Sequence, residues 1–286
     1  MRKPKFIQVF EHDRLNVGGL FTDKHLKALA AYITNNEGCR FYSLLYNGVR
    51  FNQYVGVIQV DDLTIEVLPK TDRHSLKESD WQQVLIKMLQ VSLHVEAKTT
   101  TSAAINISKL NVLDAYLLMF LEEVQTILHK GLIKKYQTTQ SNQTAFKGRL
   151  LFNKHITDNL VHAERFYVQH TVYDKNNIYN AILYKALNVI GRLSVSDVVM
   201  SKANTVLFDF PECDDVKVSE KLFSKLAYDR KTTSYKKAIE LARIILLNFH
   251  PDFKGGHNNI LAIMVDMNSL WENYIYYTLK KAEAYN

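Results

Sequence analysis

The sequence predicts an α+β protein, in which a β-rich N-terminal region is followed by a mainly α-helical region. Alternating apolar residues bounded by turn signals dominate the first 72 residues, and apolar residues at helical spacing dominate the rest. Glycine and proline are scarce, at 10 and 4 residues, which argues against loop-rich and collagen-like architectures. The length of 286 residues leaves room for about two domains, and a hydrophobic content of 47% is enough for sizeable cores.

A first β-hairpin is predicted around Asn47-Gly48. This dipeptide separates two runs rich in aromatic and β-branched residues, 40–46 and 49–54. Asn-Gly is the strongest short hairpin signal, because both turn positions adopt a positive φ that these two residues tolerate best. A short helix before the hairpin, near 22–33, is indicated by apolar residues at helical spacing.

A second pair of strands is predicted at 55–60 and 63–68, on either side of two aspartates. The second run alternates apolar and polar residues, so its apolar side chains share one face. Pro69 ends this run, because proline has no N–H to donate to a strand ladder. These elements complete a β-rich region at residues 1–72.

Helices are predicted through most of the remaining chain. Ser79 and Gln82 have the spacing of a capping box at the start of a helix. Gly131 and Gly191 follow apolar stripes, in the position of C-cap glycines. The stripes predict helices at about 81–89, 113–128, 178–190 and 235–246.

Two segments interrupt the helical pattern. Residues 138–144 are polar, uncharged and without large apolar groups, which predicts an exposed loop. Residues 260–265 are a short apolar run that suits a strand, and Asp266 or Asn268 then caps a final helix. The chain after the β-rich region divides into 73–259 and 260–286.

Charge and cysteine content indicate the partners and the compartment. Lys and Arg number 36 against 29 Asp and Glu, a net charge of +7, which favours a polyanionic partner such as nucleic acid. Two cysteines exclude a disulfide framework and an all-cysteine zinc site, as expected in a reducing, cytoplasmic setting. No apolar run reaches the roughly 18 residues of a membrane span, and no secretion signal follows the basic start.

The sequence holds no complete catalytic motif. It has no P-loop, no Gly-x-Gly-x-x-Gly and no His-Glu-x-x-His, so neither a nucleotide site nor a helical zinc site is supported. Metal nucleases use Asp/Glu-x-Lys, in which the acid binds metal and the lysine positions water. Four such triplets occur, beginning at Glu96, Asp215, Asp229 and Asp252, where composition alone predicts roughly 2.6. We therefore expect no metal-ligating set and no bound cofactor in this chain.

Basic residues interleave with aromatic residues in several places, a pattern that suits phosphate contacts and base stacking. The same pattern also fits a solvated surface, on which long side chains lie along apolar groups. The candidate nucleic-acid contacts are Lys147, Arg149, Arg165, Lys280 and Lys281, and Lys134-Lys135-Tyr136 is a further cluster.

Several motifs, in order, resemble the McrC family, the nuclease subunits of McrBC-type modification-dependent restriction systems. The motifs are Tyr54 to Val60 with Leu63 to Lys70, Lys147-Gly148-Arg149-Leu150, Asn180 to Leu187, Tyr228-Asp229-Arg230 with Tyr235, and Asp266 to Ile275. The last is the most specific, and in it Trp271 stands where the family usually has Phe. Together they span nearly the whole chain.

The resemblance implies a division of labour between this chain and a partner. The β-rich region 1–72 would dock into a ring of McrB, an AAA+ GTPase, and stimulate its GTP hydrolysis. Arg40, Arg50 and Gln53 lie near the first hairpin and are candidate partner contacts, and Arg149 is another. GTP would bind in the partner and not in this chain.

The resemblance also implies a C-terminal PD-(D/E)xK nuclease fold that cuts DNA with Mg2+. In the family, the motif around Trp271 opens that fold, so residues 260–286 would be its beginning. The metal-binding strands follow this motif, and the present sequence ends before them, at Asn286. Glu272 matches a helix glutamate that supports the metal site but cannot hold a metal alone. We therefore expect that this chain does not cut DNA by itself.

Two other interpretations stay open. One is a nucleic-acid-binding module without a ring partner, whose binding would depend steeply on salt. The other is a stand-alone metal nuclease built on Glu96 or Asp215, which magnesium-dependent cleavage by this chain would establish.

Overall fold

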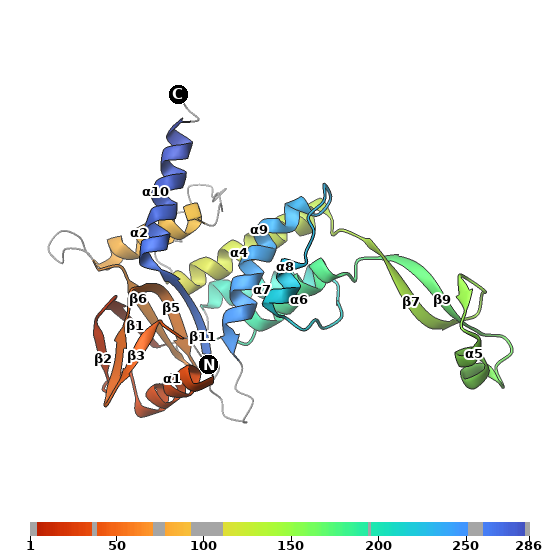
Figure 1. Cartoon of the computed structure of the whole chain (residues 1–286), viewed down its shortest axis with the longest axis horizontal. Helices are drawn as coiled ribbons and strands as arrows, with labels where there is room; N and C mark the ends of the chain where they lie inside the picture. Colours follow the sequence, from red (N-terminus) through yellow and green to blue (C-terminus); the bar gives the residue numbers. More distant parts are fainter. Residues whose placement is uncertain are drawn as a thin grey trace.

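The computed structural model describes residues 5–35, 39–70, 78–92, 111–193, 196–250 and 260–283. It is the expected α+β fold, with three small sheets, a bundle of helices beside them, and one slender arm that projects from the body (Figure 1). None of the described helices is long and apolar enough to cross a lipid bilayer. Glu96 and Asp252, which begin two of the acid-x-lysine triplets, lie outside the described residues.

The largest sheet combines strands from the two ends of the chain. Its order is β1-β6-β5-β11-β10, with β1 parallel to β6 and all other neighbours antiparallel. The strands are β1 (Lys5–Phe10), β5 (Tyr54–Val60), β6 (Leu63–Leu68), β10 (Phe249–His250) and β11 (Ile260–Asp266). The predicted strand pair at 55–60 and 63–68 is confirmed, as is the strand at 260–265. The sequence did not indicate that β11 pairs with β5.

Gly56 allows β11 to lie closely against β5. Its φ is 138°, and a Cβ at this position would lie 2.2 Å from the carbonyl oxygen of Ile263 in β11. Any other residue would push the two strands apart. The pairing places residues 260–266 inside the N-terminal sheet, although the sequence alone separated them from it. The division of the chain into three domains stays a prediction.

A second sheet and one helix complete the N-terminal region. The sheet has the order β2-β4-β3, formed by β2 (Arg14–Asn16), β3 (Tyr42–Leu45) and β4 (Gly48–Phe51). A hairpin is confirmed as β3 and β4, and the predicted helix is α1 (Asp23–Asn35). The predicted turn is wrong by one residue, because Gly48 pairs with Leu45 as the first residue of β4, and neither Asn47 nor Gly48 has a positive φ. Glycine is needed at position 48 because a Cβ there would lie 2.3 Å from the carbonyl oxygen of Leu15 in β2. Tyr42 donates a 2.9 Å hydrogen bond from its hydroxyl to the carbonyl oxygen of Leu29, which joins the sheet to α1.

The body of the protein is a helical bundle around α4 (Val112–Lys130), which is buried along most of its length. Asn111 caps the first turn of α4. Gly131, which the sequence predicts as the C-cap, ends the helix with a φ of 89°. The neighbouring helices are α2 (Glu78–Ser92), α6 (Ile178–Ile190), α7 (Asp197–Asp209), α8 (Glu220–Ser224), the 3-10 helix η1 (Thr233–Tyr235) and α9 (Lys236–Asn248). Each predicted apolar stripe therefore lies on a helix, and Gly191 is the C-cap of α6.

One expected helix cap is wrong. α2 begins at Glu78, so Ser79 lies inside the helix and is not its N-cap. Gln82 does not complete a capping box, because its Nε2 donates to both carboxylate oxygens of Glu66, at 3.0 and 2.9 Å. A long-range partner has replaced the local one that the spacing suggested.

Glu66 is fully buried and links four elements. Besides the bonds from Gln82 in α2, its carboxylate accepts from Nε2 of Gln8 in β1 and from the N–H of Val112 at the start of α4, both at 2.7 Å. Burial raises the pKa of this carboxyl group. The N-terminal sheet is therefore joined to the helical bundle through one buried carboxylate.

The arm consists of β7 (Lys135–Gln143) and β9 (Phe166–Asp174), with β8 (Arg149–Leu150) and α5 (Phe152–Asn159) at its far end (Figure 1). The segment 138–144 is mostly exposed, as predicted, but its assignment as a loop is wrong, because most of it lies in β7. A two-stranded ribbon with water on both faces needs no apolar alternation, so its sequence lacks the periodicity of a half-buried strand. The region was expected to be mostly helical, and β9 was not predicted.

The last helix, α10 (Met267–Glu283), follows β11 directly and points away from the sheet (Figure 1). The predicted cap is confirmed at Asp266, whose Oδ1 accepts from the N–H of Ser269 at 3.0 Å. This hydrogen bond and its neighbours lower the pKa of Asp266.

Candidate functional site on the projecting arm

The arm is held together by its own ladder of backbone hydrogen bonds. β7 and β9 pair along their whole lengths. Near the body, one face carries Tyr136 opposite Tyr173, with ring centroids 4.7 Å apart. Threonine and glutamine pairs continue this face toward the tip. Neither of the two buried cores among the described residues includes a side chain of β7 or β9, so the arm is an appendage to the body.

Three predicted nucleic-acid contacts lie at the tip of the arm. Lys147 and Arg149 flank Gly148, Arg165 directly precedes β9, and all three basic side chains are exposed. Gly148 has a φ of 81°, and a Cβ there would lie 2.3 Å from the carbonyl oxygen of Gln169. Glycine is therefore required for the chain to pass so close to β9. This gives a physical reason for the Lys-Gly-Arg-Leu motif.

The tip also exposes large apolar side chains. Phe146, Phe152, Ile156, Leu160 and Val161 are between 46% and 87% exposed. Apolar side chains grouped at an exposed site beside cations are typical of surfaces that bind another macromolecule. The tip therefore has the composition of a contact surface.

Two buried asparagines hold the root of the arm. Asn177 and Asn180 each donate from Nδ2 to the carbonyl oxygens of Ile133 and Lys175, at distances between 2.6 and 3.1 Å. The two carbonyls lie where the chain enters β7 and where it leaves β9. Since Asn177 and Asn180 are 3% and 0% exposed, water does not compete for these bonds. Both strands are thereby fixed to the start of α6.

Tyr235 makes a third contact at the root. Its phenolic oxygen accepts from the N–H of Ile133 at 2.9 Å, and burial raises its pKa to about 12. We call Asn177, Asn180 and Tyr235 the root clamp. The sequence marked Asn180 only through the family resemblance, and Tyr235 through the resemblance and as the first residue of the apolar stripe at 235–246. The single local signal at Asn177 is its position before an apolar stripe, as an N-cap.

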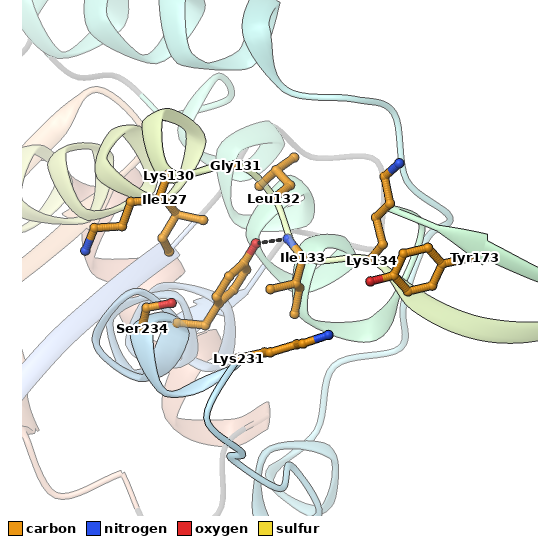
Figure 2. A pocket seen from close by; sticks show the side chains of 10 residues that line it. Ile127, Lys130, Gly131, Leu132, Ile133, Lys134, Tyr173, Lys231 and Ser234 are labelled. Atoms are coloured by element: carbon orange, nitrogen blue, oxygen red, sulfur yellow. Dashed lines mark hydrogen bonds between the residues drawn. The ribbon is translucent and has the colours of Figure 1, made fainter.

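A groove lies beside the root clamp, between the end of α4, the start of the arm and η1 (Figure 2). It has a volume of about 410 Å³. We call it the root groove and define it by Lys130, Lys134, Tyr173, Lys231, Ser234 and Tyr235. None of its described lining residues is acidic, and within the described part of the chain none of its three lysine ammonium groups forms an ion pair. The sequence marked Lys134 but not the other two lysines.

The predicted partner contacts Arg40, Arg50 and Gln53 line a different pocket, of about 610 Å³, in the N-terminal region. Arg40 and Arg50 are exposed. Gln53, just before β5, is bound to the junction of β11 and α10, because its Nε2 donates to Asp266 at 3.2 Å and its backbone carbonyl oxygen accepts from the N–H of Met267. The structure thus brings the three residues together, and their role as partner contacts stays a prediction.

The remaining candidates lie on α10, away from the arm (Figure 1). Lys280, Lys281 and Glu272 are all exposed. The Nζ atom of Lys280 lies 5.8 Å from the ring centroid of Tyr276. The five predicted nucleic-acid contacts therefore occupy two separate places.

The described residues do not form a metal centre. In those ranges no three His, Cys, Asp or Glu side chains are grouped so that they could hold a metal ion. Asp215 is exposed and paired with Lys185 at 2.8 Å, and this contact lowers its pKa. Asp229 accepts from the N–H groups of Thr232 and Lys231, which lowers its pKa. A nuclease site built on Asp215 has no support in this geometry.

The chain matches a family model described as the McrBC 5-methylcytosine restriction system component. The match covers residues 49–286, which include the arm, the root clamp and α10. No curated protein matches the sequence significantly.

Two solved structures have a similar fold. One is a chain of the cryo-EM structure of the Thermococcus gammatolerans McrBC complex, with a TM-score of 0.66 and 16% identity over 96% of this chain and 87% of that chain. The other is a chain of the refined half-complex from a tetradecameric assembly of Thermococcus gammatolerans McrB AAA+ hexamers with bound McrC. It has a TM-score of 0.65 and 16% identity over 97% of this chain and 70% of that chain. At this identity the likeness shows a common fold.

Proposed function

This chain belongs to the family of McrBC 5-methylcytosine restriction system components, and we propose that it is the McrC-like subunit of a GTP-dependent, modification-dependent DNA restriction complex. The related half-complex contains McrB AAA+ hexamers with bound McrC. By analogy, the partners of this chain are a McrB-type ring and DNA, in the cytoplasm. GTP binds in the ring, in keeping with a sequence that has no P-loop.

We assign docking on the ring to the arm. The observation that carries this proposal is a narrow projection with an exposed apolar tip, bound to the body at its root by buried hydrogen bonds. A rigid projection loses little conformational entropy on insertion into a pore, so more of its contact energy is available for binding. The sequence placed docking in residues 1–72. The arm fits a projection better, and Arg40, Arg50 and Gln53 remain candidate contacts of the body.

In this proposal, the positive charge at the tip of the arm stimulates the GTPase of the ring. Arg149 is exposed at the tip, next to Lys147. An arginine supplied in trans stabilises the charge that develops during phosphoryl transfer. The other route is indirect, with the tip biasing the ring subunits toward a conformation in which their own residues complete the site.

DNA cleavage in this proposal belongs to a nuclease domain of the PD-(D/E)xK type that begins with α10. An exposed apolar stripe on α10 supports this assignment. Trp271, Ile275 and Leu279 recur every four residues and are 51%, 38% and 60% exposed, so they are available to pack against further structure. Glu272 lies next to this stripe as the supporting residue of a Mg2+ site.

The test is GTP hydrolysis by a McrB-type ring with and without this chain. The decisive variant replaces residues 142–167 by Asn-Gly, which closes the ribbon at the Ser141–Val168 pair. We expect the complete chain to raise the hydrolysis rate and the shortened chain to leave it at the basal value. Equal stimulation by both chains would exclude the arm and favour the body contacts, which the pair Arg40→Ala and Arg50→Ala then tests.

The alternative is a nucleic-acid-binding module without a ring partner. The basic side chains at the tip favour it, since Lys147, Arg149 and Arg165 are exposed together. In that case the complete chain would bind DNA with a steep salt dependence and would not change the GTPase rate of the ring.

A further inference from the structure

The root groove concentrates positive charge in a concave site. Lys130, Lys134 and Lys231 line it, none of its described lining residues is acidic, and within the described ranges these lysines have no ion-pair partner. Like charges around a hollow with partly apolar walls raise the local potential and attract anions. The fixed charge of the groove therefore matches an anionic ligand.

The groove fits an extended anion better than a compact one. Figure 2 shows Lys130 and Lys134 at opposite ends of the groove, with Lys231 between them. A single phosphate could contact only part of this set, whereas the backbone of a nucleic acid presents one phosphate per nucleotide along its length. The Ser234 side chain lines the same wall as Lys231 and supplies a hydroxyl donor.

An aromatic platform adjoins the charged wall. Tyr173 lines the groove and packs against Tyr136 across the ribbon, with ring centroids 4.7 Å apart. Both rings reach solvent, since Tyr136 is 76% and Tyr173 is 47% exposed. The Nζ atom of Lys134 lies 6.0 Å from the Tyr173 ring centroid. Exposed aromatic rings beside lysines are the arrangement with which proteins bind unpaired bases and the adjoining backbone.

We propose that the root groove is a binding site for a single strand of nucleic acid, with backbone phosphates on Lys130, Lys231 and Lys134 and a base stacked on the Tyr136–Tyr173 pair. The site lies at the base of the arm, apart from the tip residues and the α10 residues that the sequence singled out. It does not depend on docking to a ring. A strand of modified duplex DNA that opens next to the complex is one source of such a ligand.

The first test measures fluorescence anisotropy of a labelled single-stranded DNA of about 12 nucleotides with the complete chain. The variant Lys130→Gln/Lys134→Gln/Lys231→Gln removes the proposed phosphate contacts. The control Lys27→Gln/Lys221→Gln/Lys225→Gln removes the same charge from exposed positions elsewhere. Each phosphate contact with a single strand adds about 0.7 to the magnitude of the slope of log K against log salt. Loss of three contacts should therefore lower this magnitude by about 2 in the groove variant and raise the Kd at least about tenfold. In the control the slope stays within a few tenths of the wild-type value.

The second test separates stacking from charge. Tyr136→Ala/Tyr173→Ala is expected to raise the Kd roughly tenfold while leaving the salt slope unchanged, because stacking releases no counterions. The far-ultraviolet circular dichroism of each variant shows that its fold is retained.

Competition distinguishes the sources of phosphate. Unlabelled single strand should displace the probe, whereas GTP or inorganic phosphate at the same phosphate concentration should not. Displacement by GTP or phosphate as effective as by the strand would overturn the proposal in favour of a small-anion site. The proposal would also be overturned if the wild-type chain did not bind the strand at low salt. Equal losses of affinity in the groove and control variants would overturn it as well. Unchanged strand binding with lost GTPase stimulation in the groove variant would make the groove a protein contact instead.

Discussion

Buried polar residues join the N-terminal sheet to the helical bundle and hold the arm in place. Glu66 is the clearest case, because its carboxylate accepts hydrogen bonds from β1, α2 and α4 while it is fully removed from water. A buried carboxylate is stable only where its oxygens are satisfied, so these donors and Glu66 depend on each other.

Glu66 leads to a prediction of pH dependence. Burial raises its pKa in the folded chain above the ordinary value of 4.5, so the folded state keeps a proton that the unfolded chain has lost. Its contribution to the free energy of unfolding is complete below that value and is lost as the pH rises through the folded-state pKa. As the pH rises through this range, urea unfolding should therefore show that the wild type loses free energy of unfolding relative to Glu66→Gln.

Asp215→Asn is the control for this experiment. The pKa of Asp215 is lowered by Lys185, so any contribution from it is present above the ordinary value of 3.8 and lost as the pH falls. A stability difference for Glu66→Gln that is independent of pH would contradict the prediction.

The root clamp gives a second prediction at the residue scale. Asn180→Ala leaves the carbonyl oxygens of Ile133 and Lys175 each without one donor, in a site closed to water. We expect this change to lower the free energy of unfolding by about 2 kcal/mol. Asn188→Ala, in the same helix, is the matched control, because among the described residues the side chain of Asn188 donates only to the carbonyl oxygen of Tyr184, one turn earlier. Equal losses of free energy of unfolding in the two variants would show that the bonds from Asn180 contribute no more than an ordinary hydrogen bond within a helix.

At the scale of the elements, the arm is a structural unit of its own. Its side chains are absent from both buried cores of the described residues, and its strands bond mainly to each other. The chain in which Asn-Gly replaces residues 142–167 should therefore keep the stability of the body. We expect its thermal midpoint to change by less than about 3 °C, the shift that roughly 1 kcal/mol produces at this size. A larger fall would mean that the arm supports the body.

The whole molecule depends on a strand from its C-terminal part. β11 pairs with β5 over its full length, and Ile260, Leu261 and Ile263 are buried. A chain that ends at residue 250 should fail to fold, because β5 loses one of its two neighbours and the core loses these side chains. A chain that ends at residue 275 keeps β11 and the buried Leu270, and should fold. Circular dichroism of both chains is the measurement, and a folded shorter chain would contradict the argument.

Elements whose residues carry a strong local pattern could be predicted from the sequence. The strand pair before Pro69, the helix that ends at Gly131 and the cap at Asp266 were correct, because proline and helix ends act on neighbouring residues. The hairpin near Asn47 was also correct as a pair of strands, but its turn lies one residue earlier than predicted. The family resemblance rested on similar short motifs, and the family match confirms it.

The arm, its clamp and the root groove could not be predicted in this way. β7 lacks apolar alternation because water covers both faces of the ribbon, so nothing in 138–144 distinguishes a strand from a loop. Lys130, Lys134 and Lys231 meet only because η1 packs beside the end of α4, about 100 residues earlier in the chain.

The sequence by itself therefore determined the fold class, the elements with local signals and the family. The tertiary structure decided that residues 260–266 complete the N-terminal sheet, that the projection arises from the middle of the chain, and that buried asparagines hold it. The physical reason is the range of the interactions. Turns and caps are fixed by residues a few positions apart, whereas strand pairing and buried hydrogen bonds join groups that only the folded chain brings together.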